Sequence, residues 1–429
     1  MARRDEVSRT VPHQSSSRPL VAVVHGDRSG PPLTVYAAAS ELCDLVWVVD
    51  GSREGLSTDL RLLRRLGRVV DVPGLAPGPV ADSLGPLEPA GIVVFSDDEL
   101  VAAALIAERL GLRFHPPEVA VALTDKEVQR TILAGAGMEG PKLVAIPSDA
   151  APGQWRAAGR RLGYPLVVKP RVGSTSWDTV LAPDEATLVD CARWASGREM
   201  VVEQYLPDAE PANHPGIAGY LSVETAVTAA GYRHLAVTGR LPLAPDFRET
   251  GFFIPAAVDA GTQAAVLATV EKAASALGAA AGIFRTEVKL TPDGPRVIEV
   301  NGRLGGAVAD AMLLAGGPSF HELVLRLAVG LDLPGHGLLP CDRIGFRLLY
   351  QPPRCATGVE SIEGLDRVAA LPGVTAVALH HRPGDALDWR RQGTDTNLFT
   401  VNGAVADHGA LVALHRAVAE AVTVGYRRR

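Results

Sequence analysis

The chain has 429 residues, of which 47% are hydrophobic and 21% charged, with a formal net charge of −6 at pH 7. This length suffices for two to four domains or subdomains with a substantial core. The acidic balance argues against nucleic acid as a partner, and without a run of about 18 apolar residues we expect no membrane contact. The scattered cysteines predict reduced thiols of a cytoplasmic protein: Cys43, Cys191, Cys341 and Cys355.

The first 120 residues predict a polar tail followed by an α/β domain. Residues 1–18 lack the apolar segment and cleavage site of a signal peptide, so we expect a disordered tail. Apolar runs then alternate with helical patterns, which predicts a doubly wound domain over residues 19–120. The predicted strands are 19–26, 45–49 and 91–95, and the predicted helices are 33–42 and 100–110. Ser96 and Glu99 have the spacing of a capping box. No GxGxxG motif occurs here, so we assign no nucleotide and expect this domain to pack beside an active site.

A candidate anion-binding segment follows. Asp125 opens a predicted helix that runs to about residue 134. The predicted strand 165–170 carries Lys169 near its end, just before a glycine- and hydroxyl-rich segment, residues 171–176. A lysine at the end of a buried strand needs an anion, and such a loop adds donors for phosphate, although the pattern is not a Walker A motif. The alternatives are a simple turn with Lys169 in solvent and, for Lys126, a solvated helix lysine.

A predicted β-hairpin carries two facing carboxylates. Residues 286–290 and 296–300 alternate in character and are joined by a turn-forming Pro-Asp-Gly-Pro sequence. Alternation puts Glu287 opposite Glu299 on one face, where the two carboxylates repel unless a cation lies between them. Oxygen ligands suit a hard ion such as Mg²⁺. The alternative is a solvated cluster in which three basic residues neutralise both carboxylates: Lys289, Arg296 and Arg303.

The remaining elements surround this hairpin. We predict strands at 200–206 and 220–227, helices at 262–280, 318–329 and 411–422, and a small α+β subdomain in the tail. Glu249 stands in the charged start of an apolar strand, where it is either a substrate or metal contact or a surface carboxylate.

Four features now occur in one order: Asp125-Lys126 at a helix start, Lys169-Pro170 before the Gly/Ser/Thr loop, Glu203-Gln204-Tyr205-Leu206 closing a strand, and Glu287 twelve residues before Glu299-Val300-Asn301-Gly302-Arg303. This series resembles the ATP-grasp superfamily over residues 19–422. The segment FRETGFFIPA, the loop before YLSVET and the C-terminal part further resemble the L-amino-acid ligase branch, whose members make dipeptides. The resemblance implies a combined α/β and α+β fold: an N-terminal α/β domain over 19–120, a lid subdomain over 121–200, a central subdomain with the metal site over 201–335, and a C-terminal α+β subdomain over 336–429.

The resemblance also implies an ATP and magnesium site. The phosphates would be bound by Lys126 and Lys169 under a mobile loop of Gly173, Ser174, Thr175 and Ser176. The adenine would pair with the hinge of Glu203, Gln204, Tyr205 and Leu206, and Glu210 would hold the ribose. Two Mg²⁺ ions, with Mn²⁺ as an alternative, would lie between Glu287 and Glu299, with Asn301 completing one coordination shell.

The implied reaction has two steps. A substrate carboxylate attacks the γ-phosphate to give an acyl phosphate and ADP, and an amine then displaces phosphate. Arg303 and the amides of Gly305 and Gly306 would stabilise the oxyanion, and Glu249 would orient the ammonium or remove its proton. For Arg303 the alternative is a structural ion pair with Glu299.

The pattern departs from that branch on the amine side. The predicted substrate pocket contains Glu224, Phe252, Arg285 and Ala307. The family tends to have histidine at the positions of Phe252 and Arg285, and Ala307 stands where a bulky residue would narrow the pocket, which predicts a larger amine. The expected partners are a small-molecule acid and an amine; a homodimer and a carrier protein stay open. The rival functions are a ligase that uses a carrier-protein thiol, a D-amino acid or a non-proteinogenic amine, a non-catalytic nucleotide-binding regulator, and an adenylating enzyme.

Overall fold

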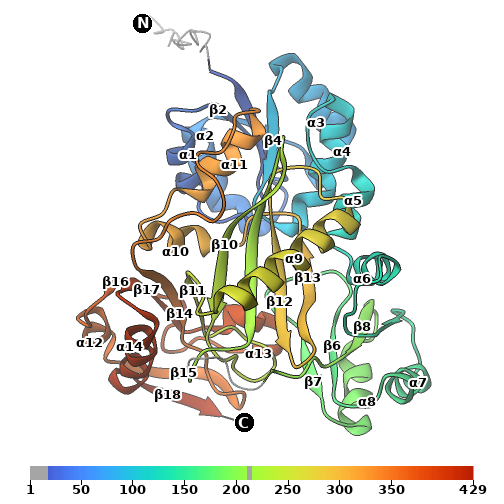
Figure 1. The fold of residues 1–429 in the computed structure, drawn as a ribbon, viewed down its shortest axis with the longest axis vertical. Coiled ribbons are helices and arrows are strands. Elements are labelled where there is room, and N and C mark those ends of the chain that lie inside the picture. Colours follow the sequence, from blue (N-terminus) through green and yellow to red (C-terminus); the bar gives the residue numbers. More distant parts are fainter. Residues whose placement is uncertain (1–17, 210–214, 429) are drawn as a thin grey trace, which may run out of the picture.

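The computed structural model describes residues 18–209 and 215–428, and within these ranges the strands form four sheets (Figure 1). The N-terminal sheet is parallel, with the strand order β3-β2-β1-β4. Its strands are β1 (Leu20–Val24), β2 (Asp44–Val49), β3 (Arg68–Asp71) and β4 (Gly91–Val94). The predicted α/β fold class is therefore confirmed for this part. We did not predict β3, because its four residues are too few and too exposed to show a buried run.

Helices connect these strands. They are α1 (Pro32–Ala39), α2 (Ser57–Leu66), α3 (Pro77–Leu84), α4 (Leu100–Leu110) and α5 (Pro117–Ala122), with short 3₁₀ turns η1 (Glu54–Leu56), η2 (Pro73–Leu75), η3 (Gly85–Leu87) and η4 (Asp97–Glu99). The Ser96 hydroxyl accepts the Asp98 amide at 3.2 Å, as its predicted capping role requires. Glu99 is buried and accepts a 2.9 Å hydrogen bond from Arg53, which ties η4 to the loop after β2.

A second, antiparallel sheet forms the lid subdomain, with the order β5-β8-β6-β7. Its elements are α6 (Lys126–Gly135), β5 (Leu143–Ile146), α7 (Pro152–Leu162), β6 (Leu166–Pro170), β7 (Val180–Ala182), α8 (Glu185–Trp194) and β8 (Met200–Gln204). The Asp125 carboxylate accepts the amides of Glu127 and Val128 and so caps α6. Trp155 of α7 and Leu188 of α8 pack with Val168 and Met200 in a core of the lid's own.

The largest sheet, here called the central sheet, has the order β13-β12-β9-β10-β11-β14-β17-β16. It comprises β9 (Tyr220–Thr228), β10 (Gly231–Arg240), β11 (Gly251–Ile254), β12 (Ile283–Thr291), β13 (Gly294–Asn301), β14 (Ile344–Leu349), β16 (Val374–Leu379) and β17 (Phe399–Val405). The predicted hairpin is β12–β13, and Glu287 and Glu299 are direct cross-strand partners as predicted. The helix α9 (Ala260–Leu277) packs on this hairpin.

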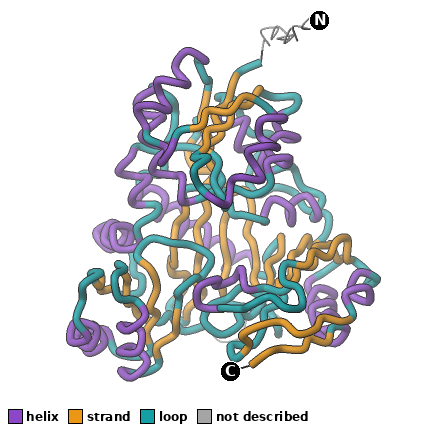
Figure 2. The backbone as a smooth tube through the Cα atoms, turned by 180° about the vertical axis from the view of Figure 1, so that it is seen from behind, coloured by secondary structure: helices purple, strands orange, loops and turns teal. Residues whose placement is uncertain are grey.

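The C-terminal part does not stand alone, since β14, β16 and β17 continue the central sheet. Outside that sheet lie α12 (Leu365–Ala369), α13 (Trp389–Gln392), η5 (Gly393–Thr396), α14 (His408–Ala421) and a two-stranded sheet of β15 (Ala356–Glu363) and β18 (Thr423–Arg428). Figure 2 shows this small sheet beside the C-terminus. The helices α10 (Val308–Leu314) and α11 (Phe320–Ala328) lead from the central sheet back to the N-terminal domain, where α11 contacts α1.

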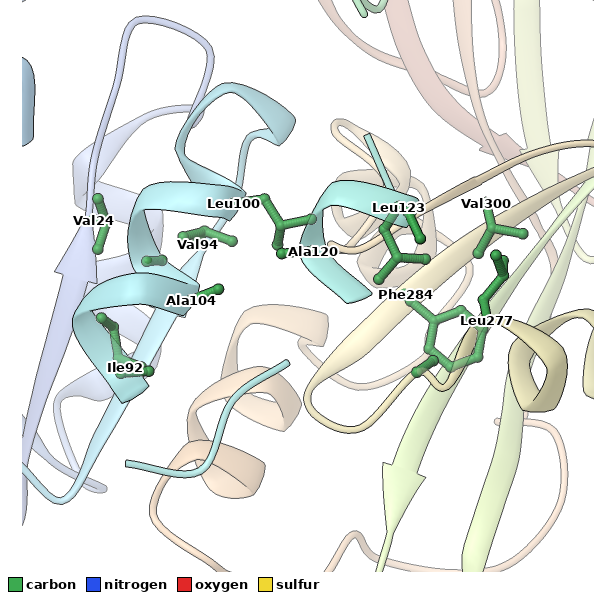
Figure 3. Close-up of a cluster of buried hydrophobic side chains, with 14 of the residues drawn as sticks. Val24, Ile92, Val94, Leu100, Ala104, Ala120, Leu123, Leu277, Phe284 and Val300 are labelled. Carbon is green, nitrogen blue, oxygen red and sulfur yellow. The ribbon is translucent and has the colours of Figure 1, made fainter. Parts of the chain in front are cut away.

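One hydrophobic core joins the N-terminal sheet to the β12–β13 hairpin. Figure 3 shows Val24 and Val94 on one side, Leu100 and Leu123 in the middle, and Val300 of β13 on the other. Because these side chains are buried in one cluster, the loop after β4 is held in place against the end of β13. In the described ranges no helix is long and apolar enough to cross a membrane.

Candidate active site

A cavity of about 1020 Å³ lies between the lid, the central sheet and the N-terminal domain. It gathers most of the predicted site residues from positions far apart in the sequence. The predicted residues that line it are Lys126, Lys169, Gly173, Ser174, Thr175, Ser176, Glu203, Gln204, Tyr205, Leu206, Glu249, Phe252, Arg285, Glu287, Glu299, Asn301, Arg303, Gly306 and Ala307. Glu224 and Gly305 are not among its lining residues, and Glu210 lies outside the described residues.

The two predicted phosphate lysines are buried at one end of the cavity. The Lys126 ammonium donates to the Gly173 carbonyl at 2.7 Å and lies 3.3 Å from the Glu299 carboxylate. The Lys169 ammonium lies 2.5 Å from the Glu203 carboxylate. The alternatives of a solvated helix lysine and a lysine in solvent are therefore wrong, because both side chains are less than a tenth exposed.

The hinge has unsatisfied hydrogen-bonding groups that face the same end. Glu203 Oε2 is buried and has no hydrogen-bond partner among the described residues, as an acceptor awaiting a donor would. The backbone N–H groups of Gln204 and Tyr205 instead donate to the carbonyls of Lys142 and Pro165. Leu206 N–H makes no hydrogen bond in the described part of the chain, so it is the hinge amide left for a ligand.

The predicted phosphate loop is held by three other parts of the molecule. Arg28, in the loop after β1, donates to the Ser174 hydroxyl at 3.1 Å. The Ser176 hydroxyl donates to the Phe247 carbonyl at 2.9 Å, and the Thr175 carbonyl accepts the Thr394 amide at 2.9 Å. Thr175 and Ser176 both have positive φ, 55° and 57°, which costs non-glycine residues energy and is retained where surrounding contacts fix the backbone.

The two hairpin carboxylates, Glu287 and Glu299, pair with cations other than the three that the sequence suggested. Glu287 lies 3.3 Å from Arg285 and accepts a hydrogen bond from the Tyr220 hydroxyl, while Glu299 pairs with Lys126. The alternative of a solvated cluster is wrong, because its three cations are paired elsewhere. Lys289 pairs with Asp208, Arg296 with Glu139 and Arg303 with Asp97.

The predicted metal ligands fit a hard cation that also binds phosphate. Glu287, Glu299 and Asn301 offer carboxylate and amide oxygens along the cavity wall, and Asn301 lies close enough to donate to Glu299 at 3.3 Å. Within the described residues no three His, Cys, Asp or Glu side chains form a complete metal cage. Mg²⁺ is commonly held by one or two carboxylates together with substrate phosphates, which this donor set allows.

The other end of the cavity is rich in charged pairs. Arg303 hydrogen-bonds to Asp97, which directly follows β4 and whose second oxygen, Oδ1, is buried without a partner among the described groups. We missed Asp97, although the carboxyl end of a parallel strand is the expected place for a ligand-facing residue. The structure thus assigns Asp97, and not Glu299, as the ion-pair partner of Arg303.

Two of the predicted roles need correction. The Gly305 amide donates to the buried Glu224 carboxylate at 3.1 Å, so it is not free to bind an oxyanion, and only the Gly306 amide is left for that role. Glu224 is fully buried beneath Arg285, 3.9 Å away, and does not reach the cavity. It therefore supports Arg285 and the Gly305 turn and is not a pocket residue.

Glu249 lies at the junction of several charges. Arg240 donates to its carboxylate at 3.0 Å, and Arg285 lies 3.8 Å away. Burial, with a further contribution from the Glu287 charge, raises the pKa of Glu249 to about 8. A carboxylate with a pKa in this range can exchange a proton near neutral pH.

The fold has close counterparts among solved structures. No protein-family model matches the chain. The structure of an L-amino acid ligase from Bacillus licheniformis matches with a TM-score of 0.73 and 21% identity, over 97% of this chain and 100% of that one. An uncharacterised protein, y4rH, of Sinorhizobium fredii is 28% identical over 313 residues, and carnosine synthase 1 of Mus musculus is 29% identical over 273.

These matches cover 69% and 57% of the present chain, which spans 60% of the length of y4rH and 32% of that of carnosine synthase 1. The parallel N-terminal sheet, the four-stranded antiparallel sheet and the eight-stranded central sheet enclose one charged cavity. The chain has the ATP-grasp fold, as its sequence motifs indicated.

Proposed function

We propose that this protein is an ATP- and Mg²⁺-dependent ligase that joins a carboxylic acid to an amine, with amino acids as substrates and ADP and phosphate as products. One observation carries the proposal. A single cavity connects buried lysines and a hinge with free hydrogen-bonding groups to paired carboxylates and then to an arginine-rich end. The resemblance to an L-amino acid ligase and to carnosine synthase 1 supports amino acids as the substrates.

Each end of the cavity has a separate task in this proposal. Lys126 and Lys169 bind the phosphates, and the Glu203 carboxylate accepts from the exocyclic amine of adenine. Mg²⁺ would be held by Glu287, Glu299 and Asn301 and would neutralise charge on the transferring phosphoryl group. Its binding requires the carboxylates to leave Arg285 and Lys126, both of which can turn toward phosphate oxygens.

The arginine-rich end would then carry out amide formation. Arg303, freed from Asp97 by the substrate, and the Gly306 amide stabilise the oxyanion of the tetrahedral intermediate. Glu249 accepts the proton of the incoming ammonium, for which its raised pKa suits it. The protonated carboxyl stays near Arg240, which also hydrogen-bonds to Ser222 and is therefore fixed.

The test is product release from ATP and Mg²⁺ with pooled amino acids, measuring phosphate and pyrophosphate separately. We expect phosphate that depends on amino acids, and a loss of at least about 1000-fold in Glu299→Ala. Glu322→Ala, on the exposed side of α11, is the matched control and should behave as wild type. Pyrophosphate as the product would contradict the acyl-phosphate mechanism and favour an adenylating enzyme.

If the pooled amino acids gave no turnover but a carrier-protein thiol, a D-amino acid or a non-proteinogenic amine did, the ligase chemistry would stand and the nucleophile would change. Tight ATP binding with no turnover on any of these would favour a nucleotide-binding regulator.

A further inference from the structure

Four arginines line or flank the ligation end of the cavity, and three of them are well partnered. Arg240 hydrogen-bonds to Glu249 and to Ser222. Arg285 also makes no hydrogen bond to the described residues, but three carboxylates surround it, Glu287 at 3.3 Å, Glu249 at 3.8 Å and Glu224 at 3.9 Å. Arg303 is hydrogen-bonded to Asp97. Their charges are balanced by the protein itself.

Arg347 of β14 is the exception. Its guanidinium makes no side-chain hydrogen bond within residues 18–209 and 215–428, and its nearest carboxylate, Asp310, is 3.8 Å away and half exposed. The Arg347 side chain is only 22% exposed, so it has lost most of its water without gaining a strong partner. One half-exposed carboxylate at 3.8 Å balances this charge only in part, so the guanidinium can bind a further anion.

The side chains around Arg347 indicate which kind of molecule carries the anion that Arg347 would bind. Arg347 is the cross-strand partner of Phe252, so both lie on the cavity face of the sheet, and Leu349 lies on the same face two residues later. Ala307 and Val308 line the cavity as well. A cation among apolar walls fits an organic molecule with a charged end, and the planar fork of arginine fits a carboxylate in a bidentate manner.

His380 shares this end of the cavity. It lines the cavity at the end of β16, and its Nε2 lies 3.1 Å from the Thr400 hydroxyl, which fixes the ring. Burial, and next the charge of Arg347, lower the pKa of His380, and both side chains line the cavity. A neutral imidazole in the same cavity leaves Arg347 as the cation of this subsite.

We propose that Arg347 binds a second substrate carboxylate, separate from the one that is phosphorylated. The α-carboxylate of an amino acid that acts as the amine substrate is the group that fits best, because Glu249, which would receive its ammonium proton, lines the same cavity as Arg347. This inference rests on the proposed function and narrows its amine substrate to amino acids whose α-carboxylate is free.

The experiment separates the two half-reactions. Hydroxylamine replaces the amine in the first assay, so hydroxamate formation reports acid activation alone. The second assay measures ligation with the amino acid found in the pooled experiment and with its carboxamide, which lacks the negative charge. Both assays are run on wild type, Arg347→Met, Arg347→Lys and a control, Arg326→Met, whose arginine on α11 has a comparably loose ion pair at 3.9 Å outside the cavity.

We expect Arg347→Met to form hydroxamate within about twofold of wild type, which also shows that it is folded. Its KM for the amino acid should rise about 10- to 100-fold, the usual effect of losing a charged hydrogen bond. The preference of wild type for the amino acid over its carboxamide should disappear. Arg347→Lys should keep part of that preference, and Arg326→Met should match wild type.

A KM increase that occurs in the hydroxamate assay, and only with dicarboxylic acids, would also support the carboxylate subsite and would assign the carboxylate to the acid substrate. Three results would overturn the inference: an unchanged KM for both substrates, equal loss with the amino acid and its carboxamide, or loss of hydroxamate formation with monocarboxylic acids, which would place Arg347 on the phosphate. Wild type that forms neither hydroxamate nor phosphate with any acid would contradict the proposed function itself.

Discussion

Adjacent residues at the ligation end have quite different roles. Gly305 gives its amide to Glu224, whereas Gly306 lines the cavity with its amide free of hydrogen bonds to the described residues. A methyl group on Gly305 would come within 3 Å of both Arg285 and Glu224, so glycine is needed for this close approach. The Gly305 N–H is therefore bound to Glu224, and the Gly306 N–H is left for a ligand.

Ala307 follows these glycines and lines the cavity. We expect Ala307→Trp to raise the KM for large amine substrates at least about 10-fold while leaving small ones within about twofold, because the indole would occupy cavity volume that large side chains need. Steady-state kinetics with amino acids of graded size checks this. Ala307→Ser, which adds a single oxygen, is the control, and undiminished use of large substrates by Ala307→Trp would contradict the prediction.

Most of the residues predicted for the site line the cavity, because they occur in ordered motifs at strand and helix ends. Asp97 and Arg347 were not predicted. Asp97 belongs to a pattern that also reads as a helix cap, and it reaches Arg303 only through the fold, 206 positions away in the chain. Arg347 lies in a short strand whose pairing with β11 fixes its direction. Contacts between distant segments are not encoded in local periodicity.

For helices and strands, local sequence signals predicted which elements form better than they predicted which strands lie side by side. The β12–β13 hairpin and the pairing of Glu287 with Glu299 were predicted, but the bulge beside Glu287 was not, and this bulge places Glu299 opposite Glu287 in place of Ile298. The helix α4 was predicted with its observed bounds, since its apolar run ends at Gly111 in the left-handed conformation. The joining of β14, β16 and β17 to the central sheet was not predicted, because the choice of neighbouring strand depends on long-range packing.

The connection between α4 and α5 carries a pH-sensitive contact. Nδ1 of the buried His115 accepts the Ala280 amide at 3.1 Å, which links this connection to the start of β12. Burial lowers the pKa of His115 from 6.5 to about 4. The folded protein therefore binds this proton more weakly than the unfolded chain, so the contribution to stability is complete above pH 6.5 and is lost as the pH falls toward 4.

We expect this residue alone to contribute a loss of about 3 kcal/mol between pH 6.5 and pH 4. His115→Asn keeps an acceptor near the Ala280 amide but cannot take up the proton, so its stability should fall less steeply over that interval. Denaturant titrations of both proteins at several pH values measure the difference. Parallel pH profiles would show that His115 does not titrate on unfolding as argued.

For the whole molecule, the cavity is closed by contacts between parts that are far apart in the chain. The phosphate loop of the lid touches Arg28 of the N-terminal domain, Phe247 before β11 and Thr394 of η5. Gly393 makes this approach feasible, because a Cβ there would lie 2.3 Å from the Thr175 carbonyl oxygen. Closure of the loop and the position of η5 are therefore coupled.

We expect Gly393→Ala to raise the KM for ATP about 10-fold by pushing the loop away from η5. Gly337→Ala is a matched control, because Gly337 also has positive φ, 63° against 56° at Gly393, but a Cβ there meets nothing within 4 Å. Both substitutions therefore place a methyl group on a residue with positive φ, and only the one at Gly393 meets the loop. Equal KM values in the two variants would show that contact with the loop does not affect ATP binding.

The separate core of the lid has a consequence for how the molecule loses its structure. Its buried apolar cluster is built from the lid's own helices and strands, and within the described residues Trp389 is the one side chain from elsewhere that packs against it. The N-terminal sheet and the β12–β13 hairpin, in contrast, share one cluster. The lid sheet with α7 and α8 is therefore a distinct cooperative unit, whose amide protons can exchange through an opening that leaves the rest folded, whereas α6 belongs with the rest through Leu133. A nucleotide bound across both units would link their unfolding transitions and slow that exchange.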